Sequence, residues 1–238
     1  MTNFSFYMYI HVQSSYRGGK MNSKDAIQSI AKKGVDKMSF VGLHNTEQGI
    51  IAFADSKATI EYWDGSLQED KERQIHKMFY NNEFIFVTHG NNELFDVNHK
   101  VNMEDYVHEN LKDNIEYQYF FDKLIENLFM YPPEYNNGIY HFIIGTKDEN
   151  GYFLVKLEID AINQDYEYSD KLYRKDAWFG GDERYINMYQ LIPKYFDVPA
   201  SQYIPMISVQ LQSMIKIYDK DFKYNTVGLP IELHLFAK

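Results

Sequence analysis

Pairs of strands joined by short turns are the feature of this sequence that most limits its fold. The clearest pair is IYHFIIGTKDENGYFLVKLEI, where two runs rich in β-branched and aromatic residues flank a turn ending in Asn-Gly at residues 150–151. A second hairpin is predicted in MSFVGLHN and GIIAFADS, with its turn at residues 45–49. A third is predicted in RQIHKMFYNNEFIFVTHG, with its turn at Asn81 and Asn82. Three hairpins in one chain predict antiparallel sheets.

Helical periodicity separates these hairpins. Residues 23–33 form an amphipathic pattern, with Ser23 as N-cap and Gly34 after the end. Apolar residues recur at helical spacing over 102–130, which predicts one long helix or two in series before Pro132. A further helix is predicted over 201–217, with Pro205 in its first turn.

The element order predicts an α+β fold of two antiparallel sheets packed face to face, with helices on both outer surfaces. Residues 40–57 and 75–89 are expected mostly in one of these sheets. The terminal segment IELHLF, residues 231–236, alternates apolar and polar residues and is expected to be a strand inside a sheet.

Composition excludes several classes of protein. The formal net charge is −10 and no long basic block is present, which argues against a nucleic-acid partner. The absence of cysteine excludes disulfides, thiolate zinc sites and cysteine nucleophiles. No apolar run approaches the roughly 18 residues of a membrane span. We therefore expect a cytoplasmic protein without a membrane partner, folded as a single domain over 1–238 with 1–37 as an N-terminal extension.

Four segments, matched in order, resemble the proteasome-type branch of the N-terminal nucleophile hydrolases. They are FVGLHNTEQGIIAFADSKAT, QIHKMFYNNEFIFVTHG, YHFIIGTKDENGYFLVKLEI and TVGLPIELHLF. The resemblance covers about residues 24–238 and implies a four-layer αββα sandwich. AIQSIAKKG is similar to the N-terminal helix of the non-proteolytic α-type subunits, whereas ADSKAT is closer to the proteolytic β-type subunits.

The resemblance also implies a site. In this family the nucleophile is the first residue of the mature chain, and its own α-amine is the base. Counting back from Asp55 places the nucleophile at Ser39, or at Met38 if the turn is one residue longer, and only Ser39 could attack. The family's activating lysine falls on Gln74, with Lys71 and Arg73 nearby but out of register. A glutamine cannot supply the positive charge that lowers the pKa of the amine.

Two further features weigh against catalysis. The family's glycine-rich serine segment is matched by Trp178-Phe179-Gly180-Gly181-Asp182, where the serine is missing, and the chain runs unbroken from Met1 through Ser39. We therefore interpret Ser39, Asp55 and Lys57 as a vestigial site, with Asp55, Ser56 and Lys57 solvated at the end of a strand. The two glycines predict a tight turn or a close approach of two backbones. A carbohydrate or peptide groove there is the alternative.

No metal or cofactor site is predicted. His89-Gly90-Asn91-Asn92-Glu93, followed by His99 and His108, lacks the Asp-rich motifs of a metallophosphatase. GGK at 18–20 lacks the frame of a phosphate-binding loop. Lys71 and Arg73 lie in LQEDKERQ, whose mixed charges are typical of a solvated loop or helix end.

Two functions remain as hypotheses. The first is a proteasome-subunit-like protein that does not cleave, with an assembly, binding or regulatory role, self-association and a protein or peptide ligand. The second is a self-processing peptidase or amidase that uses Ser39. Processing before Ser39 would shorten the chain by about 4 kDa, which a mass measurement detects.

Overall fold

The computed structural model describes residues 32–33, 39–62, 67–96, 99–132, 135–136, 138–221, 225 and 227–238. Residues 33–238 form one compact unit. The helix predicted over 23–33 lies almost wholly outside the described residues, and its last two residues form a short strand, β1 (Lys32–Lys33). Gly34 and the GGK segment also lie outside them.

A four-stranded antiparallel sheet is built around the first predicted hairpin. Its strands are, in sheet order, β13 (Asp176–Gly181), β2 (Phe40–Thr46), β3 (Gly49–Asp55) and β14 (Ile231–Phe236). The β2–β3 turn is at Glu47 and Gln48, and every residue of both strands is buried. The hairpin and the terminal strand are therefore confirmed, and β14 is an edge strand paired with β3.

A five-stranded antiparallel sheet contains the other two hairpins. Its order is β12 (Asp165–Tyr168), β11 (Gly151–Asp160), β10 (Ile139–Asp148), β7 (Phe84–Gly90) and β6 (Met78–Tyr80). Pairing of β10 with β11 is continuous from Ile139 opposite Asp160 to Asp148 opposite Gly151. Gly151 has φ +117°, as the Asn-Gly turn requires.

The prediction that residues 40–57 and 75–89 share a sheet is wrong. β2 and β3 belong to the four-stranded sheet, whereas β6 and β7 belong to the five-stranded sheet. Between them the chain forms a separate hairpin of β4 (Lys57–Tyr62) and β5 (Leu67–Gln74). Both faces of β7 are apolar, so its residue pattern alone could not choose between the two sheets.

Four helices are present in the described residues. The predicted 102–130 segment is two helices, α2 (Met103–Asn110) and α3 (Tyr117–Met130), preceded by the paired strands β8 (Glu93–Asp96) and β9 (His99–Asn102). Asn102 caps α2 by accepting a hydrogen bond from the Asp105 N–H. Helices α4 (Glu183–Gln190) and α5 (Ala200–Asp221) follow β13.

The predicted place of Pro205 is wrong. Helix α5 begins at Ala200, so Pro205 lies in the second turn rather than the first. The first turn is instead closed by hydrogen bonds from the Gln202 and Tyr203 N–H groups to the Pro199 carbonyl.

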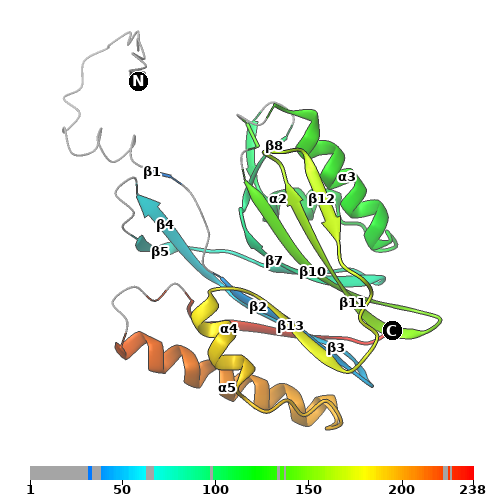
Figure 1. The fold of residues 1–238 in the computed structure, drawn as a ribbon. Coiled ribbons are helices and arrows are strands. Elements are labelled where there is room, and N and C mark those ends of the chain that lie inside the picture. Colours follow the sequence, from blue (N-terminus) through cyan, green and yellow to red (C-terminus); the bar gives the residue numbers. More distant parts are fainter. Residues whose placement is uncertain are drawn as a thin grey trace, which may run out of the picture. The chain divides into compact units, whose positions relative to one another are not determined.

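Figure 1 shows α3 beside the five-stranded sheet and α4 and α5 beside the four-stranded sheet. Three apolar clusters hold these elements together. The first lies between the two sheets and includes Val41, Leu43, Ile85 and Ile143. A second joins the other face of the five-stranded sheet to α2 and α3, and a third joins the other face of the four-stranded sheet to α4 and α5. The fold is thus α+β, with two antiparallel sheets face to face and helices on both outer surfaces. Among the described residues, no helix has the length and apolarity needed to cross a membrane.

A buried histidine lies in the third cluster. His44 on β2 is fully buried, and its two ring nitrogens lie 3.0 Å from the Tyr203 hydroxyl and 3.4 Å from the Tyr189 hydroxyl. Burial, and to a smaller extent the nearby Lys194, lowers the pKa of His44 to about 3. The imidazole is therefore neutral, with one nitrogen that donates and one that accepts.

Candidate active site

A buried ion pair joins the end of β3 to the residue before β6. Lys77 Nζ lies 3.2 Å from Asp55 Oδ1 and 3.3 Å from Oδ2, and it also donates to the Lys57 carbonyl oxygen at 3.0 Å. Asp55 is 1% exposed and Lys77 is 2% exposed, so the expectation that Asp55 and Ser56 are solvated at the end of the strand is wrong. Buried charges of this kind persist only when each has partners, and here the amine has three oxygen acceptors.

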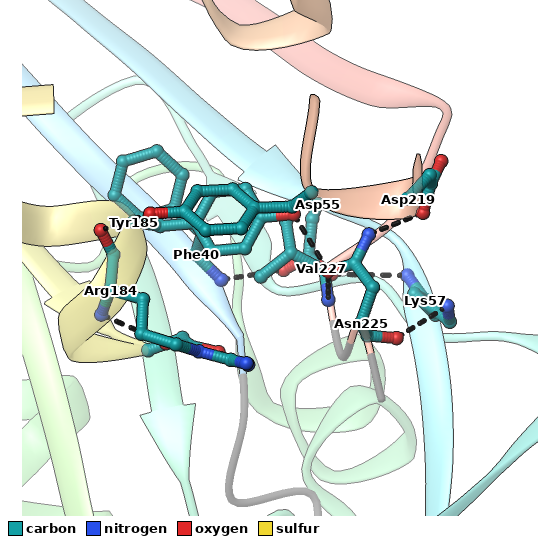
Figure 2. Close-up of polar contacts among 10 residues, drawn as sticks. Phe40, Asp55, Lys57, Arg184, Tyr185, Asp219, Asn225 and Val227 are labelled. Carbon is teal, nitrogen blue, oxygen red and sulfur yellow. Dashed lines mark hydrogen bonds and ion pairs between the residues drawn. The ribbon is translucent and has the colours of Figure 1, made fainter. Parts of the chain in front are cut away.

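The same carboxylate holds the start of β2. Asp55 Oδ1 accepts a hydrogen bond from the Phe40 N–H at 2.8 Å, and Oδ2 accepts one from the Lys57 N–H at 3.3 Å (Figure 2). Asp55 Oδ1 therefore contacts both the Lys77 amine and the backbone nitrogen of Phe40, the residue after Ser39. The pair lies directly at the first residue of the strand.

The electrostatics of Asp55 combine opposing effects. Burial raises the pKa of its carboxyl group, while the Lys77 charge and the Phe40 and Lys57 N–H groups act against that rise. Every hydrogen bond described here has Asp55 as the acceptor, which is the pattern of a carboxylate. We therefore treat Asp55 and Lys77 as an ion pair.

The residue of the third predicted hairpin that contacts Asp55 is Lys77 and not Gln74. Gln74 pairs with Lys57 in the β4–β5 hairpin and its side chain is exposed, whereas Lys77, three residues later, reaches Asp55. Lys71 and Arg73 lie in strand β5, not in a loop or helix end. One signal in the sequence marks Lys77: it stands directly before the strand MFY, two residues after the apolar Ile75.

Ser39 lies at this site with a backbone contact on its other side. It is 1% exposed, and its carbonyl oxygen accepts a hydrogen bond from the Asp182 N–H at 2.7 Å. Gly181 has φ +107°, and a Cβ placed there would lie 1.7 Å from the Ser39 oxygen. The predicted close backbone approach at the two glycines is confirmed, because only glycine fits this contact.

Lys57, the third predicted site residue, faces a different partner. Its Nζ donates to the Asn225 carbonyl oxygen at 2.7 Å, so its side chain is tied rather than solvated. Asn225 Oδ1 in turn accepts from the Tyr185 hydroxyl at 2.6 Å (Figure 2). The structure thus brings Ser39, Asp55 and the Lys57 backbone together, and it adds Lys77, which sequence reasoning missed.

Asp182 follows the two glycines directly and precedes helix α4. Its carboxylate is buried, caps α4 by accepting from the Arg184 N–H at 2.9 Å, and pairs with the Arg184 guanidinium. A capping carboxylate at the first turn of a helix is stabilised by the exposed N–H groups there.

The first histidine of the histidine motif lies in the five-stranded sheet. His89 stacks on His141 with ring centroids 4.7 Å apart, and these histidines belong to the paired strands β7 and β10. In the described part of the chain, no group of three or more histidine, aspartate or glutamate residues could hold a metal ion. The comparisons with protein-family models and with curated proteins both find no match for this chain.

Proposed function

We propose that the chain is an N-terminal nucleophile hydrolase of the proteasome type that acts on amide bonds once Ser39 becomes the first residue. The observation that carries the proposal is the buried Asp55–Lys77 pair at the start of β2. One of the three arguments against an active site is that Gln74 stands at the position of the family's lysine. With Lys77 in contact with Asp55, that argument no longer holds.

The layered packing of sheets and helices also supports the proposed family. The resemblance implies an αββα sandwich, and the three apolar clusters lie where such a sandwich needs them, between the sheets and under each helix layer. The four segments that carry the resemblance supply strands to both sheets. This agreement is independent of the ion pair, because it concerns packing and not charge.

The chemistry follows from three groups. With residue 38 removed, the free α-amine of Ser39 takes the hydroxyl proton while the oxygen attacks the amide carbonyl carbon. The amine then gives that proton to the leaving nitrogen, and water hydrolyses the ester to restore the hydroxyl. The positive charge of Lys77, oriented by Asp55 and the Lys57 carbonyl, favours the unprotonated form of the α-amine at neutral pH.

A second candidate is a non-catalytic subunit-like protein that binds or assembles. It is favoured by the absence of the expected serine from the segment around Gly180 and Gly181, and by Met38, which acylates the Ser39 nitrogen as long as it is attached. In this case the Asp55–Lys77 pair holds the start of β2 and does nothing more. The two candidates differ in what Ser39 does when its amine is freed.

The test therefore frees the amine deliberately. Residues 33–38 are replaced by the recognition sequence of a site-specific protease that cuts before serine, so that cleavage leaves Ser39 first. Cut and uncut protein are then treated with a hydroxyl-reactive β-lactone and with a panel of fluorogenic amides. We expect labelling at Ser39 in the cut form only, located by peptide mass spectrometry, with turnover of at least one amide.

Three variants sharpen this test. Ser39→Ala should abolish labelling, and Lys77→Met should reduce it by at least about tenfold through the loss of charge beside the amine. A double variant, Lys77→Met with Gln74→Lys, keeps the number of lysines but moves the lysine to position 74. It should not recover labelling. Absence of labelling in a cut, folded protein would leave the non-catalytic candidate.

A further inference from the structure

Strand β14 forms an open edge of the four-stranded sheet. It pairs with β3 in continuous register, from Ile231 opposite Asp55 to Phe236 opposite Ile50. In the described part of the chain, no strand lies on the other side of β14, and no backbone hydrogen bond is made there. Every second residue of such an edge directs its N–H and carbonyl groups outward, so β14 can pair with another strand.

Incomplete burial marks the same edge. Leu233 lies opposite Phe53 and Leu235 opposite Ile51, and all four belong to the apolar cluster under α4 and α5. Helix α5 packs on both strands, yet the two β3 residues are fully buried while Leu233, Leu235 and Ile231 are only partly buried. The surface that remains exposed therefore lies toward the open edge, where a further strand would bury it.

The strand lacks the usual protection of an edge. Natural edge strands are blunted by lysine, proline, a bulge or short length. Residues 231–236 read IELHLF, without lysine or proline, and six residues is an ordinary strand length. Glu232 carries the one acidic side chain of β14 and lies 2.8 Å from His76 Nδ1. A partner strand therefore needs a hydrogen-bond donor opposite Glu232 rather than a second carboxylate.

The sequence of β14 supplies that donor itself. A two-fold axis perpendicular to the sheet would bring a second copy alongside in antiparallel orientation and keep both α5 helices on one face. Because side chains alternate between faces, this axis must pass through a residue. On Leu233 it places Glu232 opposite His234 of the second copy, twice, and Ile231 opposite Leu235 of the second copy.

The neighbouring registers are less favourable. An axis through Glu232 sets two carboxylates against each other, and an axis through His234 sets Glu232 against Phe236 of the second copy. The His234 ring stacks on Tyr80 of β6 with ring centroids 3.9 Å apart, and Tyr80 is 52% exposed. This margin of the five-stranded sheet is therefore also open to solvent.

We propose that β14 pairs with β14 of a second copy of this chain, so that two four-stranded sheets join into one sheet of eight strands. The outward backbone groups of the two edges bond to each other, Glu232 accepts from His234 of the second copy, and the apolar side chains meet below the α5 helices. This contact is independent of Ser39 and does not rest on the hydrolase function.

Disulfide trapping tests the register directly, because the full chain has no cysteine of its own. Residues directly opposite in antiparallel strands have Cα atoms about 4.5–5.5 Å apart, which a disulfide can span. Under mild oxidation, Leu233→Cys should cross-link to itself. Ile231→Cys is the matched control on the same face of the strand, because its own counterpart would lie about 14 Å away. It should not cross-link alone, but it should when mixed with Leu235→Cys.

Charge substitutions test the contact by light scattering, with circular dichroism to confirm folding. The unmodified chain should show a dimer of twice 28.3 kDa at high concentration. His234→Glu sets carboxylates opposite Glu232 and should raise the dissociation constant at least about tenfold, and adding Glu232→Lys should recover the dimer. Gln118→Glu adds the same charge at an exposed position on α3 and should leave the dimer unchanged.

Three results would overturn the proposal. They are a monomer at every concentration, equal cross-linking of Leu233→Cys and Ile231→Cys, and a dimer that His234→Glu leaves unchanged. Because trapping at Leu233 reports contact between the two β14 strands alone, association through another surface does not imitate it.

Discussion

Replacing Lys77 with methionine tests the central ion pair through its effect on stability. Methionine has a similar length and no charge, so the substitution removes three hydrogen bonds from the amine and leaves Asp55 buried with two backbone donors. Since Asp55 is 1% exposed, water cannot replace the lost partner. We expect the free energy of unfolding to fall by about 3–5 kcal/mol, the cost of leaving one buried charge unpaired.

A double-mutant cycle measures the coupling itself. Asp55→Asn alone strands the Lys77 charge and should cost a similar amount. The double variant, Asp55→Asn with Lys77→Met, buries no charge and keeps an oxygen acceptor for the Phe40 N–H, so its cost should be about 1 kcal/mol or less. The sum of the single costs should therefore far exceed the cost of the double variant.

Urea unfolding at pH 7, followed by circular dichroism, supplies the four free energies. Lys123→Met is the surface control, because the Lys123–Glu126 pair has exposed side chains and its removal should leave the unfolding midpoint unchanged. Single variants that cost less than about 1 kcal/mol each, with strictly additive costs, would refute the reasoning that this pair is buried and coupled.

Three further predictions follow from other parts of the fold. Because burial lowers the pKa of His44 to about 3, the unfolded chain takes up a proton near pH 6.5 that the folded chain does not. The free energy of unfolding should then fall by up to about 1.4 kcal/mol per pH unit below that value, and His44→Gln should lose this share of the slope in urea titrations at pH 4 to 7. Gly181→Ala should lower the free energy of unfolding by at least about 2 kcal/mol, against about 1 kcal/mol for Gly151→Ala. Both glycines have positive φ, but only Gly181 faces a backbone oxygen. Equal losses of stability in thermal unfolding would contradict this. Leu191 and Val209 are 85% and 65% exposed on the α4–α5 side. Light scattering should show self-association that Leu191→Ser and Val209→Ser each reduce, whereas a strict 28.3 kDa monomer at high concentration would contradict it.

Local chemistry explains why much of the fold could be predicted from the sequence. The Asn-Gly turn at 150–151 adopts its conformation through contacts within a few residues, and the runs on either side then pair in register. Asn102 caps α2 through its own side chain, and α3 ends at Met130 just before the prolines. These features depend on near neighbours, so the order of residues carries them.

Pairings between distant strands were decided only by the tertiary structure. β7 is apolar on both faces, and it joins β10 across more than one intervening helix and strand, a choice that depends on packing of the whole sheet. The prediction that it shares a sheet with β2 and β3 failed for this reason.

The residues of the candidate site also divide into those found from the sequence and those that only the structure revealed. Ser39 and Asp55 were identified through the family resemblance, by counting back from Asp55 with the spacing of that family. Lys77 was missed because the β4–β5 hairpin lies between it and Asp55, and the length of that hairpin shifts any count along the chain. Residue order thus determined the hairpins, the helix ends and two members of the site. The tertiary structure decided which lysine meets Asp55 and which backbone meets Ser39, because a buried charge takes the partner that reaches it in space.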